Sequence, residues 1–363
     1  MRICTIIGTR PEIIRLSRII FKLDKLCEHI LIHTGQNYDQ KLNDIFFQEL
    51  KIRLPDIFLG CHTGVFGEQI GVMFTQIEQL LLKNKPDKVL ILGDTNSGLC
   101  AIVCERLGIP VYHLEAGNRC FDKRVPEEIN RKIIDSISTI NLPYTNLSKE
   151  NLIHDGVSKN KIFVVGNPIY EVLTHHQKEI EQSSILKKLN LKPQKYFLST
   201  FHRAENVDNF LTLKQIVGGL SLLTSRFNLP VICSIHPRTL DKIKKWTIDT
   251  DNPNILFSEP FGFFDFVKLE KNAFCIVSDS GTVAEESCIL HTPNVIIRNS
   301  TERPEVIECG SNILSGVVSS SRIANCVEII TQMNNKWIVP TEYTISDVSD
   351  RVVKILLGEH DVK

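Results

Sequence analysis

Residues 277–287, Val-Ser-Asp-Ser-Gly-Thr-Val-Ala-Glu-Glu-Ser, decide the fold of this chain. An apolar run over residues 274–278 passes directly into a Ser-Gly turn, which opens a helical pattern. The first N–H groups of a helix lack backbone partners and carry the positive end of its dipole, which suits a pyrophosphate. Taken alone, Ser-Gly could equally be an N-cap. The segment predicts a strand–turn–helix unit of a doubly wound sheet.

The same alternation of strand and helix extends along the whole chain. Five apolar β-rich runs of the first half predict buried strands at 3–7, 29–33, 88–92, 111–114 and 162–165. A second set follows at 197–201, 231–235, 255–257, 274–278 and 294–297. Helical patterns of the first half lie at 12–23, 68–82, 98–107 and 127–138. This order is typical of α/β proteins with parallel sheets covered by helices.

Length and element order predict two domains. A chain of 363 residues exceeds one ordinary domain. We expect a Rossmann-like N-terminal domain over 1–168 and a second Rossmann-like domain over 169–346, with the boundary near Pro168. The last helical pattern, at about 347–358, could pack back on the first domain.

Composition excludes several classes of function. Hydrophobic residues make up 42% of the chain and charged residues 23%, as in a globular enzyme. The net charge is zero, so bulk electrostatics favours neither nucleic acid nor an anionic membrane. The N-terminus lacks a signal-peptide pattern, and no apolar run approaches the roughly 18 residues of a spanning helix. The 11 cysteines form no C-x-x-C pair. We therefore expect a cytoplasmic protein with free thiols and no metal site.

Ligands of doubly wound sheets bind beyond the carboxyl ends of the strands, so the residues that follow each strand matter most. In the first half these are Arg10 with Arg15, then Asp94, Glu115 and Glu127. Each also has a simpler interpretation: solvated arginines of a surface turn, a loop aspartate, or first-turn acids that stabilise any helix. The succession of charged residues at consecutive strand ends favours a site.

The second half repeats this arrangement. One strand ends in His202-Arg203 and the next in His236, a pattern that core packing does not explain. Ser280-Gly281 opens the helix quoted above, and Glu286 lies where a carboxylate could accept from both ribose hydroxyls. Arg303, flanked by acids, could contact a ligand or form a buried ion pair. One of the phenylalanines at 261–266 could stack on a base.

The order and identity of these motifs resemble one family, the non-hydrolysing UDP-N-acetylglucosamine 2-epimerases. The matching motifs cover nearly the whole chain: Gly-Thr-Arg-Pro-Glu at 8–12, Gly-Asp-Thr at 93–95, His-Leu-Glu-Ala-Gly at 113–117, Pro-Glu-Glu-Ile-Asn-Arg at 126–131, His-Arg-Ala-Glu-Asn at 202–206, Asp-Ser-Gly at 279–281 and Thr-Glu-Arg-Pro-Glu at 301–305. The opening Arg-Pro-Glu-Ile-Ile-Arg-Leu-Ser and residues 115–122 and 279–282 look most like a capsule and O-antigen branch. That branch converts UDP-2-acetamido-2,6-dideoxy-L-talose to UDP-N-acetyl-L-fucosamine.

The resemblance implies a glycosyltransferase-B architecture, in which two Rossmann-like domains face each other across a cleft and the C-terminal domain holds most of the UDP. It assigns acid/base roles to Asp94, Glu115 and Glu127, and a catalytic role near the phosphates to His202. It assigns pyrophosphate and ribose contacts to Arg10, Ser280, Gly281 and Glu286, and places Phe266 near the uracil. Arg15, Arg203, His236 and Arg303 complete the expected substrate contacts. The resemblance also implies a homodimer that needs no metal or nicotinamide cofactor.

Two positions depart from the family pattern. Arg15 stands where many members have Lys, which keeps the charge but changes the reach of the side chain. Thr282 stands where many have a second Gly, so the pyrophosphate contacts could shift. Neither departure changes the expected reaction class, but both weaken the case for the common gluco sugar.

The family's route explains why several carboxylates are needed. Because the C2 hydrogen is unactivated, UDP leaves C1 first, a carboxylate then removes the acidified C2 proton, and a 2-acetamidoglycal forms. A proton returns to the other face of C2 and UDP adds back, so two faces need more than one acid/base group. Alternatives are UDP-GlcNAc/UDP-ManNAc as the substrate pair, a glycosyltransferase, a hydrolysing relative, or a UDP-sugar-binding module without catalysis.

Overall fold

The computed structural model describes residues 1–36, 40–61, 65–316, 319–333 and 336–359, and of 40–43 it describes the backbone alone. The chain divides into two compact units. Unit 1 comprises Met1–His175 and Thr341–Lys363, and unit 2 comprises His176–Pro340. Helix α7 (Ile169–His175), which follows Pro168, is part of unit 1.

Unit 1 is built on a parallel sheet. Its six strands within the described residues are ordered β3-β2-β1-β4-β5-β6, and every pair runs parallel. Their bounds are β1 (Arg2–Ile7), β2 (Glu28–His33), β3 (Ile57–Phe58), β4 (Lys88–Leu92), β5 (Val111–Leu114) and β6 (Ile140–Leu142). The order reverses between β1 and β4, which defines the switch point of a doubly wound sheet.

Unit 2 repeats this topology. The strand order of its described residues is β12-β11-β10-β7-β8-β9, again with every pair parallel. The strands are β7 (Phe197–Thr200), β8 (Val231–Ser234), β9 (Ile255–Ser258), β10 (Cys275–Ser278), β11 (Asn294–Ile296) and β12 (Asn312–Leu314). Its switch point lies between β7 and β10. Both units therefore share one Rossmann-type order.

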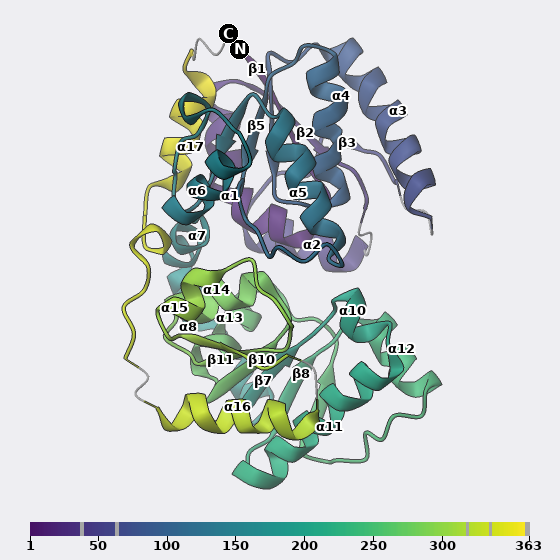
Figure 1. Cartoon of the computed structure of the whole chain (residues 1–363), viewed down its shortest axis with the longest axis vertical. Coiled ribbons are helices and arrows are strands. Elements are labelled where there is room, and N and C mark those ends of the chain that lie inside the picture. Colours follow the sequence, from purple (N-terminus) through teal and green to yellow (C-terminus); the bar gives the residue numbers. More distant parts are fainter. Residues whose placement is uncertain (37–39, 62–64, 317–318, 334–335, 360–363) are drawn as a thin grey trace. The chain divides into compact units, whose positions relative to one another are not determined.

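Helices cover both sheets (Figure 1). Those of unit 1, besides α7, are α1 (Arg10–Leu26), α2 (Gln40–Glu49), α3 (Phe66–Asn84), α4 (Ala101–Arg106), α5 (Pro126–Ile137), α6 (Asn146–His154) and α17 (Val348–Leu357). Those of unit 2 are α8 (Gln177–Gln182), α9 (Ile185–Lys188), α10 (Ala204–Val207), α11 (Phe210–Phe227), α12 (Pro237–Lys245), α13 (Phe263–Asn272), α14 (Gly281–Ile289), α15 (Pro304–Glu308) and α16 (Ser320–Gln332). Among the described residues, none of the helices combines the length and apolar character needed to cross a membrane.

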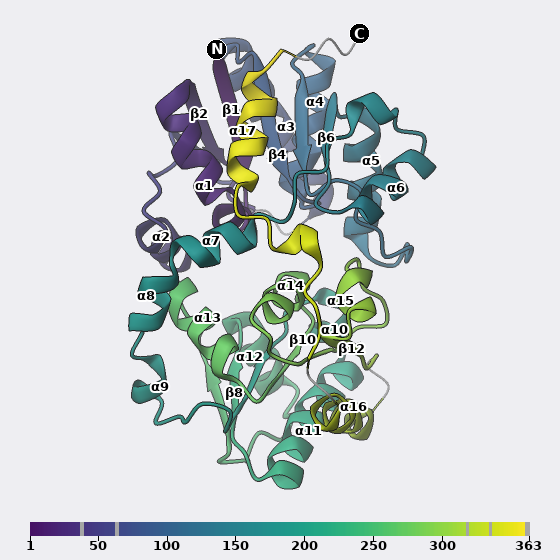
Figure 2. The same ribbon diagram turned by 90° about the vertical axis from the view of Figure 1, so that its left-hand side faces the viewer.

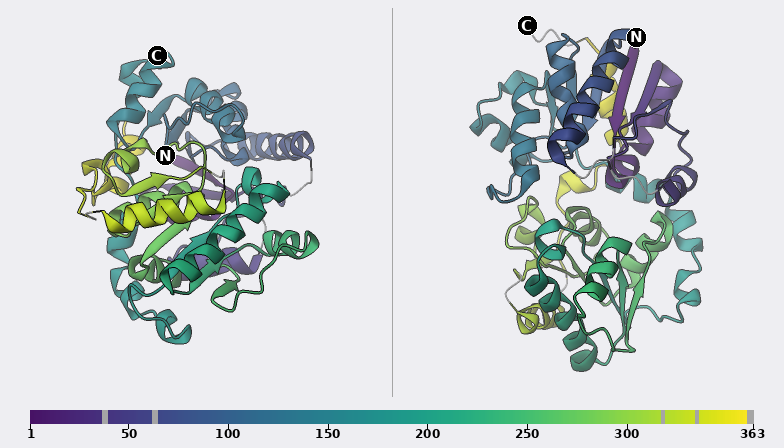
Figure 3. Two further views of the ribbon diagram at one scale, coloured as in Figure 1. Left: turned by 60° about the horizontal axis from the view of Figure 1, so that its bottom comes forward. Right: turned by 90° about the vertical axis from the view of Figure 1, so that its right-hand side faces the viewer.

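Two long-range helix contacts complete the layers. Helix α17, from the end of the chain, packs against α1 within unit 1 (Figure 2). Helix α16 lies beside α11 on the sheet of unit 2 (Figure 3, left). Each unit has its own apolar core, centred on Ile6, Val89 and Val111 in one and on Phe197, Val231 and Val277 in the other. The 11 cysteines are free thiols, as expected.

The α/β fold predicted from the sequence is confirmed, and nine of the ten expected strands are present. Residues 162–165 are the exception, because Ile162 makes only an isolated bridge to Asn141 of β6. Two further backbone bonds, from Phe163 N to Asn141 O and from Val165 N to Pro143 O, tie this segment to the sheet edge. The sequence interpretation missed β3, β6 and β12, which have only two or three residues each and hence almost no period-2 pattern.

A glycine fixes the turn that follows β5. Gly117 has a φ of 81°, and a Cβ built on it would lie 2.1 Å from the Ser148 carbonyl oxygen of α6. Its N–H donates to the Asp135 carboxylate of α5. Only glycine allows this backbone to approach both helices so closely.

We expect Gly117→Ala to lower the free energy of unfolding by about 3 kcal/mol or more, since it adds a backbone clash to the cost of a left-handed alanine. The control is Gly108→Ala, where φ is 73° and a Cβ would meet open space, so only about 1–2 kcal/mol should be lost. Urea unfolding of both variants measures the difference. Equal losses would show that the contact with Ser148 does not matter.

Candidate active site

The switch point of unit 1 is held together by Glu12, a buried residue of the first turn of α1. Its carboxylate accepts from the N–H groups of Gly8 and Thr9, which follow β1. It also accepts from Thr95 Oγ1 at 2.8 Å, which follows β4. Burial raises the pKa of Glu12 to about 7, although these hydrogen bonds oppose the shift. Glu12 thus connects the two turns from which Arg10 and Asp94 project.

Glu115, directly after β5, is the most tightly held of the predicted catalytic carboxylates. Its Oε2 accepts from Arg15 Nη1 at 2.6 Å and from the Tyr144 hydroxyl at 3.1 Å. Asn118 Nδ2 donates to its other oxygen at 3.3 Å. The guanidinium of Arg15 also lies over the Tyr144 ring, 5.6 Å from its centroid. Glu115 has a φ of 69°, a conformation that a non-glycine residue adopts only when its surroundings impose it.

Asp94 belongs to a second ionic cluster, which follows the neighbouring strand β4. Arg131 of α5 contacts Asp94 Oδ2 through Nε at 2.7 Å and Nη2 at 2.6 Å, and it also contacts Glu128 through Nη1 at 2.9 Å. Glu128 accepts from the backbone N–H groups of Cys120 and Phe121, so it shapes the loop after Glu115. Burial opposes ionisation of Glu128, but these bonds and Arg131 lower its pKa overall. Asp94 keeps 20% of its side chain exposed, whereas Glu128 keeps 2%.

Glu127 lies beside this cluster in the first turn of α5, and it is half-buried. Of the two acids that open α5, the structure therefore places Glu128 in the interior and leaves Glu127 partly accessible. The simpler interpretation of first-turn acids fits Glu128, which has an organising role. Glu127 keeps the solvent access that proton exchange requires.

A third network holds the turn after β5 that contains Glu115, because Asp135 accepts from the Gly117 N–H of this turn. His113 Nδ1 lies 2.8 Å from Asp135 Oδ1, and its Nε2 lies 2.8 Å from the Gly93 carbonyl oxygen. Both ring nitrogens therefore lie within hydrogen-bond distance of oxygen atoms. Arg119 bridges Asp135 and Asp155 at 2.7 and 2.8 Å. Burial opposes ionisation of Asp135, but bonds from His113 and Arg119 lower its pKa overall.

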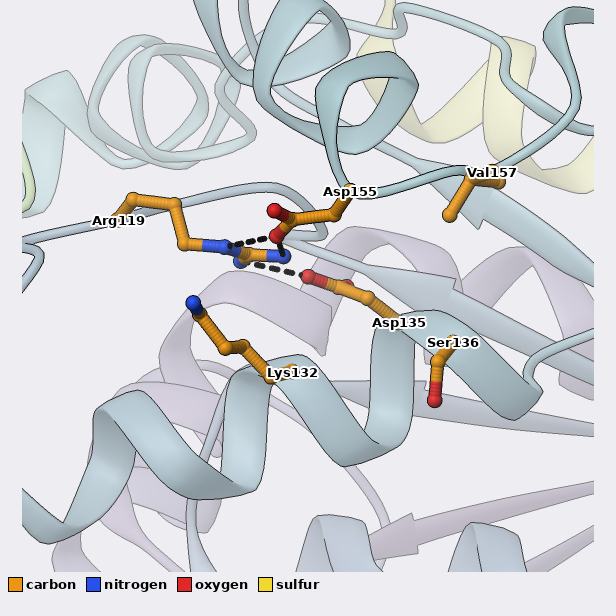
Figure 4. A pocket seen from close by; sticks show the side chains of 6 residues that line it. All are labelled: Arg119, Lys132, Asp135, Ser136, Asp155 and Val157. Carbon is orange, nitrogen blue, oxygen red and sulfur yellow. Dashed lines mark hydrogen bonds and ion pairs between the residues drawn. The ribbon is translucent and has the colours of Figure 1, made fainter. Parts of the chain in front are cut away.

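Arg119 also lines a cavity of about 240 Å³ within unit 1, together with Lys132, Asp135, Ser136, Asp155 and Val157 (Figure 4). In this cavity Arg119 points between the two aspartates, and dashed lines mark its ion pairs with both. The predicted catalytic carboxylates are not among its lining residues. The cavity therefore lies beside the Arg119–Asp135–Asp155 network that holds the turn after β5.

The switch point of unit 2 has its own buried carboxylate, Asp279, which follows β10. It accepts from the backbone N–H groups of His202 and Arg203, which follow β7, at 3.0–3.1 Å. Asn206 Nδ2 donates to it at 3.0 Å and also to the Ile297 carbonyl oxygen. Asp279 thus sets the path of the chain at His202, whose side chain is 55% exposed. His202 Nδ1 lies 3.5 Å from the same carboxylate.

The N-terminus of α14 follows at once. Ser280 is the N-cap, and its hydroxyl lies 3.0 Å from that of Thr282, the residue that departs from the family pattern. A Cβ on Gly281 would lie 2.9 Å from Glu302 Oε1, so a larger residue would displace this carboxylate. The structure places Ser280, Gly281 and Thr282 around one helix end, where N–H groups suit an anion.

The loop after β11 is held by an arginine–glutamate network. Arg298 Nη1 contacts Glu302 at 2.7 Å, Arg203 Nη2 contacts the same carboxylate at 3.3 Å, and Arg303 Nε contacts Glu285 of α14. Of the two sequence interpretations of Arg303, the structure contains the buried ion pair. The ligand contact expected for Arg303 stays a prediction.

Glu286, expected at the ribose, follows Glu285 on α14 and is buried. Glu270 of α13, close to Glu286, is fully buried. Burial and the Glu286 charge raise the pKa of Glu270 well above its usual range. The raised pKa favours the protonated form of this carboxyl group. Phe266, expected near the uracil, lies one turn before Glu270 on α13 and is half-buried.

The remaining predicted residues, Arg10 and His236, also follow the carboxyl ends of strands. Arg10 begins α1 and its guanidinium lies 6.0 Å from the Phe46 ring centroid. His236, after β8, caps α12 by accepting from the Arg238 N–H. Sequence reasoning assigned no site role to Arg131, Tyr144 or Glu270. Arg131 and Tyr144 meet their partners across 37 and 29 residues of sequence, and Glu270 lies on a different helix from Glu286. No local motif reveals these pairings. Among the described residues, no cluster of His, Cys, Asp and Glu side chains suits a metal ion.

Comparisons with known proteins identify relatives along nearly the whole chain. A UDP-N-acetylglucosamine 2-epimerase of Methanocaldococcus jannaschii is 42% identical over 98% of this chain and 99% of its own. The UDP-2,3-diacetamido-2,3-dideoxy-D-glucuronate 2-epimerase of Pseudomonas aeruginosa is 35% identical over 89% of this chain and 92% of its own. The crystal structure of the M. jannaschii enzyme with UDP-GlcNAc and UDP superimposes with a TM-score of 0.93 at 42% identity, covering 98% and 99% of the two chains. The model of the UDP-N-acetylglucosamine 2-epimerase family matches residues 21–357, and the chain belongs to this family.

Proposed function

We propose that this protein is an isomerase that inverts C2 of a UDP-N-acetylhexosamine by eliminating UDP and adding it back to a 2-acetamidoglycal. The observation that carries the proposal is the row of carboxylates at neighbouring strand ends of unit 1, each held in a different environment. Membership of the epimerase family supports the same reaction. Two faces of C2 must exchange protons, so a set of acid/base groups is required.

We assign the nucleotide to unit 2. The N–H groups at Ser280 and Gly281 would stabilise the departing pyrophosphate. His202, which is exposed after β7 and lies 3.5 Å from Asp279, the residue before Ser280, would donate to it. Glu286 would accept from the ribose hydroxyls, with Phe266 near the base. Arg203, His236 and Arg303 are further proposed contacts.

We assign the sugar chemistry to unit 1. Asp94 and Glu127 are accessible enough to exchange protons with a ligand, whereas Glu115 is immobilised by Arg15 and Tyr144. An immobile carboxylate beside a guanidinium is suited to removing a proton at one fixed position. Arg10 and Arg15 would add positive charge near the departing UDP.

Two sugars are candidates for the substrate. The M. jannaschii relative is named for UDP-GlcNAc, which supports the UDP-GlcNAc/UDP-ManNAc pair. The motif at 115–122 favours UDP-2-acetamido-2,6-dideoxy-L-talose and its product UDP-N-acetyl-L-fucosamine. Use of the product in capsule or O-antigen synthesis, and assembly as a homodimer, stay predictions of the sequence resemblance.

Incubation with either UDP-sugar in deuterium oxide tests the reaction. We expect deuterium at C2 and a second C2 epimer in the NMR spectrum, with no acceptor present, because the C2 proton exchanges with solvent. The sugar that shows both signals is the substrate. Free sugar would indicate a hydrolase, and turnover only with an acceptor would indicate a glycosyltransferase.

Single amide variants test the carboxylates. Asp94→Asn, Glu115→Gln and Glu127→Gln should each lower kcat by about 10²-fold or more, since each loses a proton-transfer group. Glu78→Gln changes an exposed carboxylate of α3 and should leave kcat unchanged. If all three active-site variants keep the parent rate, the assignment is wrong.

The Glu270–Glu286 pair gives a third test. Because the raised pKa of Glu270 favours its neutral form, the neutral variant Glu270→Gln should leave KM within about threefold of the parent. Glu270→Leu leaves the buried Glu286 without a polar neighbour at this position and should raise KM by about tenfold or more. Steady-state kinetics at neutral pH measures both. Equal KM values for the two variants would contradict this role of Glu270.

A further inference from the structure

Two thiols of unit 2 lie in contact with each other. Cys288, on α14, and Cys309, directly after α15, have their Sγ atoms 3.6 Å apart. Cys288 is fully buried, whereas Cys309 is partly exposed. They are 21 residues apart in sequence, and their two helices pack against each other. The proposed reaction uses neither thiol.

The surroundings make the two thiols unequal. Cys309 Sγ lies 3.3 Å from Ser311 Oγ and 3.6 Å from the Val306 carbonyl oxygen. Hydrogen bonds from Cys288 and Ser311 lower the pKa of the Cys309 thiol, although burial opposes the shift. The bond to Cys309, and then burial, raise the pKa of Cys288. The accessible sulfur is thus the one that ionises first.

We propose that Cys288 and Cys309 form a redox-modification site, which hydrogen peroxide converts to an intramolecular disulfide between α14 and α15. The Cys309 thiolate attacks the peroxide oxygen, releases hydroxide and becomes a sulfenic acid. The Cys288 thiol then attacks that sulfur, its proton leaves with the sulfenic hydroxyl as water, and the S–S bond forms. In sum, two thiols and one hydrogen peroxide give one disulfide and two waters.

The bond would act on the helix that carries the proposed ribose carboxylate. A disulfide has its sulfurs about 2.0 Å apart, so the atoms must approach from 3.6 Å. Cys288 lies two residues after Glu286, and its carbonyl oxygen accepts from Trp337 Nε1 at 2.9 Å, which limits how far it moves alone. The closing movement therefore falls mainly on Cys309 and α15, whose N-cap residue, Arg303, pairs with Glu285 of α14. On this basis, which rests on the proposed function, the oxidised protein binds UDP more weakly.

Oxidation of the 363-residue chain tests this proposal directly. After treatment with hydrogen peroxide, we expect the mass to fall by about 2 Da, the thiol count to fall by two from 11, and a non-reducing peptide map to join Cys288 to Cys309. Dithiothreitol should restore the original mass. Calorimetric titration with UDP should give a Kd raised by about threefold or more in the oxidised protein.

Matched variants separate the outcomes. Cys309→Ser and Cys288→Ser should each prevent the cross-link, whereas Cys326→Ser, which changes another thiol of unit 2, should preserve it. A stable gain of oxygen on Cys309 without a cross-link, or an unchanged Kd in the cross-linked protein, would overturn the inference. Failure of the reduced protein to bind UDP would instead overturn the proposed function.

Discussion

The candidate site depends on one interaction that occurs in both units: a buried carboxylate that accepts backbone N–H groups at the switch point of the sheet. In unit 1, Glu12 ties the turn after β1 to Thr95 after β4. In unit 2, Asp279 ties the end of β10 to the N–H groups of His202 and Arg203 after β7. Strand ends at a switch point diverge, because the connecting helices leave toward opposite faces. A carboxylate that bonds both ends fixes their separation, and with it the positions of the side chains that follow.

The two units differ in which charged side chains are fixed by ion pairs near these strand ends. In unit 1 the carboxylates after β4 and β5 face arginines from α5 and α1, so Asp94 and Glu115 are held as ion pairs. In unit 2 the side chains fixed by ion pairs are arginines. Arg298 and Arg203 contact Glu302, and Arg303 contacts Glu285. Breaking one partner of such a buried pair is costly, which favours one geometry for each side chain. The first arrangement suits proton transfer, and the second suits a rigid rim around the end of α14.

The sequence predicted the α/β fold and the strand ends because apolar runs and their following residues are local signals. Pro11, Ser280 and Gly281 mark helix starts in the same local way. The partners of those residues were not predictable from one sequence. Tyr144 meets Glu115 from a loop 29 residues away, and Arg131 meets Asp94 across 37 residues. The strand expected at 162–165 was wrong. The apolar pattern is present, but the short strand β6 occupies the position beside β5, and Ile162 makes only a bridge to β6.

A chain with no net charge offers no bulk attraction for an anion, so the pyrophosphate binding proposed for unit 2 would rely on local groups. Two of the arginines near α14, Arg298 and Arg303, are paired with Glu302 and Glu285. One such local group is the end of α14, where Gly281 leaves room for the Glu302 carboxylate and the Ser280 and Thr282 hydroxyls lie together. Burial and the Glu286 charge also raise the pKa of Glu270, which favours its uncharged form and so lowers the negative charge near Glu286. The proposed binding would rely on the N–H groups at the start of α14 and on a lowered negative charge at Glu270. It would need no excess of lysine and arginine, which is consistent with the zero net charge of the chain.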